Sequence, residues 1–486
     1  MRVNYQTNNS TQFRILSDDQ CKELYSAALQ VLQHTGFEVH SKEALDLLSD
    51  NGASVKGDRA YIPASVVQRA LDAAPKCFFV YGRQGDRSKS LDIRPNHVHY
   101  GLGAGCVSFQ DPCTGKRREY HREDAATVAR VADALPHIDF VQSLGTIGNI
   151  PQNLTDVYEF AEMTVNTSKP LVTYVHSMEI LRVVHKIAVA AAGGEEEFIR
   201  HPNYLVLGSP ASPLFEEPFA VERLFYCARH QIPYISTSAV TCGATSPVTM
   251  AGTLVQVMAE ELAELVIEQL AVPGSPFLLG GVHSVMDMST GILAYGAPEM
   301  SMLLAAQTEI ARYLGLPYYS TAGCSDSKLV DEQAALEGAI SILMAGLSGA
   351  NMIHDVGYIE FGSTGSLQQT VMMDEVIGMV KHILAGIQVT PESMALDVID
   401  RVGPGGQYLT DDHTLEHFKT EFWFPTLLDR KPWQAWEAAG AKSLGKRVQE
   451  KLNRIMDTHT CAPLKESTRE TIDIILAEAE AKAGRA

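Results

Sequence analysis

The chain lacks the cysteine patterns of a zinc-stabilised or disulfide-stabilised fold, and it has no long apolar run. Its eight cysteines include no CxxC pair, which argues against a structural zinc site or a disulfide framework. No stretch approaches the ~20 uninterrupted apolar residues of a membrane helix, and the polar start MRVNYQTNNSTQF lacks the apolar core of a secretory signal. We therefore expect a cytoplasmic protein with reduced cysteines.

Basic residues are also scarce. The sequence has 39 Lys and Arg against 58 Asp and Glu, for a net charge of −19. This balance argues against general binding to nucleic acid or to an anionic membrane, because both attract positive charge. A cationic small molecule would instead be attracted.

Nucleotide-binding signatures are missing as well. No GxxxxGK[ST] motif occurs, and GLGAG at 101–105 is not a GxGxxG motif that opens a helix. Hydrophobic residues make up 45% of the 486 positions and charged residues 20%, as in an ordinary globular enzyme. A chain of this length exceeds the roughly 250 residues of a bare (β/α)8 barrel, so we expect substantial terminal additions.

The pattern that is present is a short apolar strand, a polar or glycine-rich loop and a long helix, repeated from residue 97 onward. Eight strands are predicted, at 97–101, 138–144, 171–175, 204–207, 233–238, 277–281, 318–321 and 351–356. Helices are predicted between them, at 122–134, 155–165, 218–229, 248–270, 298–314 and 331–346. Apolar strands that alternate with helices indicate a parallel sheet covered on both faces.

Eight such units favour an α/β fold of the (β/α)8 TIM barrel type, although the pattern alone leaves an open doubly wound sheet as the alternative. Residues 1–95 read as a helical and β cap, whose first helix follows Ser17 and stops at Gly36. Residues 96–385 form the expected barrel, and 386–486 form a helical extension packed on it.

In a barrel, functional groups gather at the carboxyl ends of the strands, so these ends can be read as the walls of one pocket. The predicted walls are polar and aromatic: Tyr100 with the GLGAG loop, 143–149, Tyr174 and His176, Ser209, Ser238 with Thr241, His283 with Ser284, Ser325 with Asp326, and His354 with Asp355 and Tyr358. His283, Asp326 and His354 follow three consecutive strands. We therefore expect Tyr100, His283, Asp326 and His354 around a single opening.

A metal is a competing use for such histidines. HExxH is missing, but His413 to His417 reads HTLEH, which matches the HxxEH pattern of inverted zinc peptidases. The match is short and lies outside the predicted barrel strands, where it also fits two histidines on one face of a helix. We expect no directly bound metal.

Four stretches carry a family resemblance: RVGPGGQYLTDDHTLEHFKTEFWFPTLLDRKPWQAW (401–436), STAGCSDSKLVDEQAALEGAISILMAGLSGANMIHDVGY (320–358), HTGFEVHSKEALDLLSDNGASVKGDRAYIP and ALDAAPKCFFVYGR. Together they resemble the trimethylamine methyltransferase superfamily over nearly the whole chain. The resemblance implies a (β/α)8 barrel that passes a methyl group from an amine to the cobalt of a cobalamin carried by a separate corrinoid protein. The founding enzymes contain pyrrolysine. None of the 486 positions of this chain is pyrrolysine, so the resemblance is to the branch that acts on quaternary amines such as betaines.

The chemistry of such a substrate suggests roles for the candidate residues. A quaternary ammonium has no N–H, so ring faces and carboxylates hold it, and it departs as a neutral amine without a general acid. We expect His354 and Asp326 to orient the substrate and stabilise its charge as the catalytic residues. The expected substrate-binding residues are Tyr100, Tyr358, His283, Phe361 and Trp423, and the glycines expected to let the corrinoid approach are Gly103, Gly323 and Gly357.

Two rival functions remain open at this point. One is a barrel methyltransferase with radical chemistry or a pterin acceptor, and the other is a non-catalytic protein that binds quaternary amines. The expected partners are the corrinoid protein, the small amine and further copies of the same chain.

Overall fold

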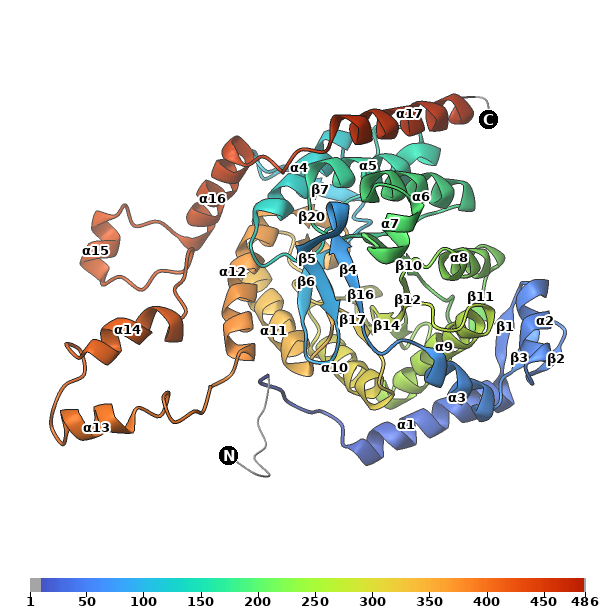
Figure 1. The fold of residues 1–486 in the computed structure, drawn as a ribbon, viewed down its shortest axis with the longest axis horizontal. Helices are drawn as coiled ribbons and strands as arrows, with labels where there is room; N and C mark the ends of the chain where they lie inside the picture. The colour runs from blue at the N-terminus through green and yellow to red at the C-terminus, as the bar shows by residue number, and fades with distance from the viewer. Residues whose placement is uncertain (1–9, 485–486) are drawn as a thin grey trace.

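A computed structural model describes residues 10–484 and is built around one parallel sheet with helices outside it (Figure 1). The sheet has seven strands in the order β6-β18-β17-β14-β12-β10-β9. These strands are β6 (His99–Leu102), β9 (Leu171–Thr173), β10 (Tyr204–Gly208), β12 (Tyr234–Ser238), β14 (Phe277–Gly281), β17 (Tyr318–Thr321) and β18 (Met352–Val356). Seven of the eight predicted strands are thereby confirmed.

The eighth predicted strand, 138–144, is not a regular strand. Phe140 makes a single parallel bridge to Gly101 of β6, and Val141 makes one to Leu171 of β9. This segment therefore contacts the two edge strands of the sheet, one on each side. The curled sheet and its covering helices are TIM-barrel-like.

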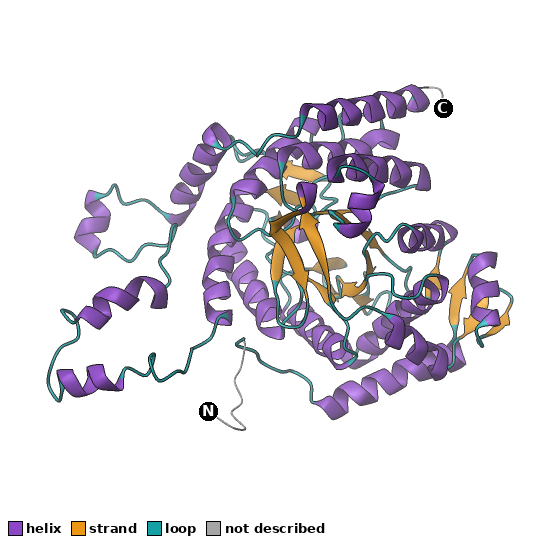
Figure 2. Cartoon of the chain, viewed as in Figure 1, coloured by secondary structure: helices purple, strands orange, loops and turns teal. Residues whose placement is uncertain are grey.

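The covering helices follow the strands in the predicted alternation. They are α4 (Arg122–Ala134), α5 (Thr155–Asn166), α6 (Met178–Ala192), α7 (Glu195–Arg200), α8 (Pro218–Arg229), α9 (Met250–Ala271), α10 (Pro298–Tyr313), α11 (Glu332–Ser348) and α12 (Leu367–Leu384). All six predicted helices of this region are confirmed, and α4 and α8 match at both ends. Figure 2 shows these helices in purple around the orange strands.

The interior of the sheet is filled by one side chain from most strands. The buried hydrophobic cluster inside the curled sheet contains Phe140, Val172, Leu205, Ile235, Leu278, Tyr319 and Met352. Three residues of the antiparallel pair β4 (Phe78–Gly82) and β5 (Asp86–Ile93) join this cluster, namely Val80, Leu91 and Ile93. The β4-β5 pair therefore plugs one end of the sheet, and any binding site must open at the other end.

The remaining N-terminal elements pack along the outside, mostly against α9. They are α1 (Asp18–Gln30), a π-helical turn (Val31–Thr35), β1 (Phe37–Val39), α2 (Lys42–Asp50), β2 (Ser54–Lys56), β3 (Arg59–Tyr61) and α3 (Ala64–Ala73). Ser17 caps α1 with a reciprocal capping box to Gln20, and Gly36 at φ 81° ends the helical segment. Both sequence signals thus act as predicted.

The C-terminal residues form an arm and two docked helices. The arm, 386–442, contains α13 (Leu396–Val402), α14 (Asp412–Glu421) and α15 (Trp433–Ala438), joined by long loops. It extends away from the sheet in Figure 1. The chain then returns as α16 (Leu444–Thr458), which contacts α12 and α4, and α17 (Glu466–Ala483), which contacts α6 and α5.

Short strands lie at the end of the sheet opposite the β4-β5 pair. They are β7 (Ser108–Gln110), β8 (Arg117–Arg118), β11 (Phe215–Glu216), β13 (Thr241–Cys242), β15 (Ser284–Asp287), β16 (Ile292–Ala294), β19 (Tyr358–Ile359) and β20 (Thr364–Ser366). They lie in loops that follow β6, β10, β12, β14 and β18. No helix within 10–484 has the length and hydrophobicity that a bilayer crossing requires.

Candidate active site

A cavity of about 470 Å³ lies at the carboxyl ends of the parallel strands. Its walls include the strand-end residues Gln142, Thr173, Ser209, Thr237 and His354. Among the described residues that line it are three carboxylates, Asp156, Glu159 and Asp355, and the aromatic rings Tyr174, Tyr295, Tyr358 and Phe361. No lysine or arginine is among these lining residues, so the cavity is aromatic and acidic.

His354 and Asp355 are consecutive residues, yet both side chains face the cavity. Neighbouring side chains of a regular strand point to opposite faces. Here the pairing of β18 with β6 shifts between Ile353 and Val356, and Asp355 adopts φ 70°. This irregularity turns the carboxylate back toward the imidazole, and Nδ1 of His354 lies 2.6 Å from Oδ1 of Asp355.

The other nitrogen and the face of His354 are also engaged. Nε2 lies 2.9 Å from the hydroxyl of Thr321, which donates to the carbonyl of Gly281 at 3.0 Å. The ring stacks on Tyr319 with centroids 4.2 Å apart and planes 12° apart. The imidazole is therefore held by three contacts, and each of its ring nitrogens has a partner.

Asp355 is surrounded by two tyrosines from rim loops. The hydroxyl of Tyr295 donates to Oδ2 of Asp355 at 3.4 Å, and the rings of Tyr295 and Tyr358 meet edge to face with centroids 6.3 Å apart. The hydroxyl of Tyr358 donates to the carbonyl of Ala104. One wall of the cavity thus combines ring surface with a carboxylate.

A second part of the lining contains an Asp–His pair and a buried glutamate. Nδ1 of His176 donates to Asp156 at 2.9 Å, and this hydrogen bond raises the pKa of His176. The side chain of Asp156 is almost fully buried, whereas that of His176 is 65% exposed. Burial raises the pKa of Glu159 to about 8, so this carboxyl is largely protonated at neutral pH.

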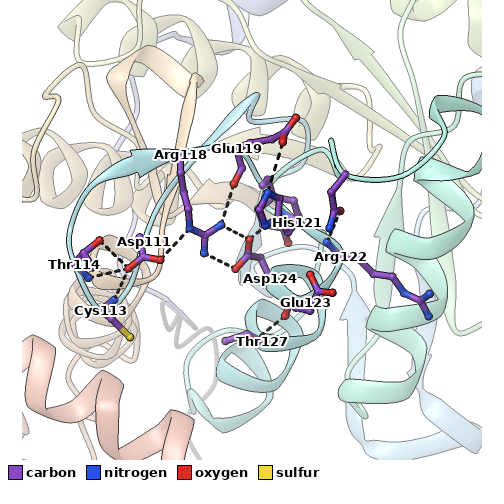
Figure 3. Close-up of polar contacts among 12 residues, drawn as sticks. Asp111, Cys113, Thr114, Arg118, Glu119, His121, Arg122, Glu123, Asp124 and Thr127 are labelled. Atoms are coloured by element: carbon purple, nitrogen blue, oxygen red, sulfur yellow. Dashed lines mark hydrogen bonds and ion pairs between the residues drawn. The ribbon is translucent and has the colours of Figure 1, made fainter.

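An ion-pair network braces the rim beside this cavity (Figure 3). Arg118 donates to Asp111 at 2.9 Å and to both carboxylate oxygens of Asp124 at 2.6 and 2.8 Å. The guanidinium holds the pKa of Asp111 at about 2. The adjoining Tyr120 donates to the carbonyl of the cavity residue Ser143, so the network supports the wall without entering it.

Asp326 lies next to the cavity but does not line it. It accepts hydrogen bonds from the backbone N–H groups of Tyr295 and Gly296 at 2.8 and 2.9 Å. Burial raises its pKa. Asp326 thus fixes the loop that carries Tyr295, and it does not touch the cavity contents directly.

The single opening expected for Tyr100, His283, Asp326 and His354 is not observed, because only His354 lines the cavity. Tyr100 is fully buried, and its hydroxyl donates to the carbonyl of Ile342 on α11. His283 is also fully buried, beside the hydroxyl of Tyr318 at 3.1 Å, and burial lowers its pKa to about 3. Both side chains point toward the helices, away from the interior.

The C-terminal candidates are farther from the cavity. Trp423 follows α14 on the arm, where its ring lies 5.6 Å from the guanidinium of Arg430. His413 and His417 lie on α14 with ring centroids 4.4 Å apart, also outside the cavity lining. The arm therefore brings none of these side chains to the cavity of its own chain.

The expected glycines have packing roles. A Cβ on Gly103 would lie 2.2 Å from Oδ1 of Asp355, so glycine makes room for this carboxylate, which lines the cavity. Gly323 and Gly357 have φ 79° and 107° and face Val356 and Thr370. The glycines that line the cavity are instead Gly105 and Gly362.

Sequence reasoning missed Tyr295 and Glu159. Tyr295 comes from a rim insertion after β14, for which no periodicity gives a position. Glu159 had a usable signal, because a carboxylate on the apolar side of the helix α5 is unusual and a buried charged group often marks a functional site.

The fold and the site together define a protein of the TIM-barrel-like class with an acidic, aromatic cavity at the strand ends. The family model described as trimethylamine methyltransferase (MTTB) matches residues 1–484. The trimethylamine methyltransferase MttB of Desulfitobacterium hafniense (strain DSM 10664 / DCB-2) is 34% identical over 96% of this chain and 94% of its own length. The glycine betaine methyltransferase of Desulfitobacterium hafniense (strain Y51) is 30% identical over 87% of this chain and 88% of its own.

Among solved structures, the monomethylamine methyltransferase of Methanosarcina barkeri aligns with a TM-score of 0.52 at 12% identity, covering 92% of this chain and 88% of that chain. At this identity the likeness supports the fold alone. The chain belongs to the trimethylamine methyltransferase family, and it is a methyltransferase without pyrrolysine in its sequence.

Proposed function

We propose that this methyltransferase transfers a methyl group from a small, betaine-like quaternary amine to a cobalamin carried by a separate corrinoid protein. The observation that carries the proposal is the cavity itself, whose described lining combines aromatic rings and carboxylates with no lysine or arginine. Such a lining favours a cation that cannot donate a hydrogen bond, because ring faces and carboxylates attract it without N–H donors.

The ammonium group binds at the wall formed by Asp355, Tyr295, Tyr358 and Phe361. Phe361 lines the cavity in the turn that follows β19. Each desolvated ring contact contributes about 0.5–2 kcal/mol, and Asp355 adds the opposite charge. Tyr358 and Phe361 keep the roles expected from the sequence, whereas Tyr295 and Asp355 take the places expected for Tyr100 and His283.

The tail of the substrate binds at the second part of the lining, where Asp156, His176 and Glu159 lie. Because Nδ1 of His176 is held by Asp156, Nε2 is the nitrogen left to donate a hydrogen bond to an anion. Glu159, protonated at neutral pH, adds a second donor. This wall suits the carboxylate of a betaine, which a site made only of carboxylates would repel.

The chemical step needs positioning more than acid catalysis. A reduced corrinoid, when the carrier protein presents it, supplies the nucleophile that receives the methyl group. The C–N bond breaks with its electron pair left on nitrogen, so the amine leaves neutral and takes no proton. His354, with both nitrogens engaged, orients Asp355 and the substrate in line. Asp326 acts as a positioning residue for Tyr295.

The rim has room for a flat macrocycle. Gly105, which has φ 93° and open space where a Cβ would lie, lines the cavity. The loops after β6, β12 and β14 expose the apolar side chains of Val107, Val248 and Met288. We assign these residues, in place of Gly103, Gly323 and Gly357, to contact with the corrinoid.

The parallel sheet closes into a (β/α)8 barrel through the segment 138–144. Its bridges to β6 and β9 connect the two edges of the sheet, and the ring of Phe140 fills the interior against Gly101, where a Cβ would lie 2.3 Å from it. We retain 1–95, 96–385 and 386–486 as the cap, the barrel and the C-terminal extension, of which 1–9 and 485–486 lie outside the described residues.

The exposed side chains of the arm support self-association of the chain, and the free cysteines support a cytoplasmic location. The arm exposes Leu409, Leu415, Phe422 and Trp433, each more than 60% accessible, which favours a second copy of the chain as its partner. All eight cysteines are free, as expected in the reducing cytoplasm. Light scattering with and without the substitutions Leu415→Ser and Trp433→Ser tests the assembly.

One experiment separates the proposal from its rivals. The protein is incubated with Co(I) cobalamin or its carrier protein and with glycine betaine, proline betaine, carnitine, choline or trimethylamine, and the demethylated amine is measured. We expect product from a betaine only when Co(I) is present. Product with a pterin acceptor instead would support the other methyltransferase class, and binding without product would support a binding protein.

A further inference from the structure

Two histidines and a glutamate converge far from the cavity, where α6, α7 and α8 meet. His185 lies on α6, Glu195 begins α7, and His230 follows α8. One ligand atom from each lies within 4.8 Å of the other two. Within 10–484 this is the one group of three or more His, Cys, Asp or Glu side chains with that geometry.

The distances do not suit direct hydrogen bonds. Nε2 of His185 lies 3.7 Å from Oε1 of Glu195, and Nδ1 of His230 lies 3.8 Å from the same oxygen. Hydrogen bonds of this type span about 2.7–3.2 Å. Ligands of a tetrahedral ion with bonds of about 2.0–2.1 Å are separated by ~3.3 Å, so both histidine–glutamate distances exceed that separation by about half an ångström or less.

His185 points an unpaired nitrogen into this group. Its side chain is only 6% exposed, and Nε2 is a buried atom with no hydrogen-bond partner. A buried polar atom without a partner is costly. When Nδ1–H of His185 donates to the hydroxyl of Tyr204, Nε2 carries a lone pair that faces the other two side chains.

Neighbouring side chains hold both rings in position. Nδ1 of His185 lies 3.1 Å from the hydroxyl of Tyr204, which is the kind of contact that orients a metal-binding histidine through its second nitrogen. The rings of His185 and Phe198 meet edge to face at 5.0 Å, and His230 lies against Tyr226 at 4.2 Å. The two imidazoles are therefore preorganised before any ion binds.

We propose that His185, Glu195 and His230 bind a zinc-like divalent transition-metal ion. Two imidazoles and one carboxylate suit Zn²⁺, whereas Mg²⁺ and Ca²⁺ prefer oxygen ligands. The side chains of Glu195 and His230 are 53% and 39% exposed, so water reaches the fourth position. This ion clamps α7 to α6 and α8 and takes no part in methyl transfer.

This inference departs from the expectation that the chain binds no metal directly. It also differs from the HTLEH motif, whose histidines lie on the exposed arm. Variants at both candidate metal sites are tested in parallel, so that the site that binds the ion is identified.

The test uses the full-length, untagged protein, loaded with Zn²⁺, freed of excess ion and analysed for metal content, with Co²⁺ absorption as the probe of tetrahedral geometry. We expect one ion per chain and a higher melting temperature with Zn²⁺. Glu195→Gln and His230→Gln should each weaken binding at least tenfold. Tyr204→Phe, which keeps the ring and removes the hydroxyl, should weaken it by about tenfold.

Two pairs of control variants make the result decisive. Glu196→Gln and His201→Gln change the same helix region outside the three ligands and should leave binding unchanged. His413→Gln with His417→Gln should also leave it unchanged. The proposal is overturned if wild-type protein retains no ion, if the ligand variants bind as wild type does, or if the α14 variants remove the ion. Circular dichroism of each variant confirms that loss of binding is not loss of fold.

Discussion

Nδ1 of His354 lies 2.6 Å from the carboxylate of Asp355, although the two residues are adjacent in one strand. A shift in strand pairing and the left-handed backbone of Asp355 bring both side chains to one side. Such backbone costs of order 1–3 kcal/mol and persists only where surrounding structure enforces it. The pair is thus a built feature of the cavity.

Replacement of His354 should separate orientation from proton transfer. His354→Gln retains hydrogen-bonding atoms near Thr321 and Asp355, so kcat/KM should fall by about tenfold. His354→Ala loses all three contacts and should lose about 100-fold through misplacement of Asp355. Steady-state kinetics at several pH values measure both. Equal loss in the two variants, with a wild-type ionisation near pH 6.5 that both abolish, would indicate acid–base catalysis instead.

Gly103→Ala should disable the site through a steric clash. The new Cβ would lie 2.2 Å from Asp355 and 2.4 Å from the ring of Tyr358, so we expect about 1–3 kcal/mol of lost stability and about 100-fold lower kcat/KM. Gly445→Ala is the matched control, because its φ is not positive, as at Gly103, and no atom lies within 4 Å of its Cβ. Full activity in Gly103→Ala would contradict the placement of Asp355.

Substitution by leucine should weaken substrate binding at Tyr295, whereas at Tyr100 it should lower only the stability of the protein. Tyr295→Leu removes a ring from the cavity, and substrate binding should weaken by about five- to thirtyfold, or ~1–2 kcal/mol. Tyr100→Leu should leave binding unchanged and lower stability by about 1–3 kcal/mol, because Tyr100 packs against α11. Calorimetric titration and thermal melts measure the two effects. Weaker binding in Tyr100→Leu alone would reverse the assignment.

Asp326 should act through the loop that it holds. Asp326→Ala removes the acceptor for two backbone N–H groups, so Tyr295 loses its position and KM should rise by about tenfold, for ~1.5 kcal/mol. Asp287→Ala is the control. Asp287 lies in the exposed turn of the β15-β16 hairpin, which directly precedes Tyr295, and this variant should retain the wild-type KM. If kcat alone falls in Asp326→Ala, a direct catalytic role is indicated.

The stability of the protein should depend on pH through Glu159. Its pKa is about 8 in the folded protein and near 4.3 in an unfolded chain, so the folded state binds the proton more tightly. This contribution to the free energy of unfolding is complete below about pH 4.3 and is lost as the pH rises through 8, with a slope of at most ~1.4 kcal/mol per pH unit.

Glu159→Gln replaces the titrating carboxyl group by a neutral amide. It should abolish the part of the pH dependence of the unfolding free energy that Glu159 contributes. The quantity to measure is the difference in unfolding free energy between wild type and Glu159→Gln, by urea denaturation at pH 5, 6, 7 and 8. Subtraction cancels other buried carboxyls. A difference that does not change with pH would show that Glu159 is charged in the folded protein.

The sequence by itself determined the elements, the family and the end of the fold that carries the site. Seven of eight strands and six of the covering helices follow from hydrophobic runs and periodicity, and Ser17 and Gly36 mark the ends of the first helical segment. Such signals are local, because capping and burial on a helix or strand depend on neighbours along the chain. His354, Tyr358 and Phe361 were also identified as candidates from the sequence.

Only the tertiary structure decided which strand side chains face the interior. A shift of one residue sends a side chain to the opposite face, and on β17 Tyr319 points into the sheet's interior while its neighbour Tyr318 contacts His283 outside it. Tyr100 falls on the outer side for the same reason. The irregularity at Asp355, the rim position of Tyr295 and the convergence of His185, Glu195 and His230 depend on packing between segments far apart in sequence, for which periodicity gives no signal.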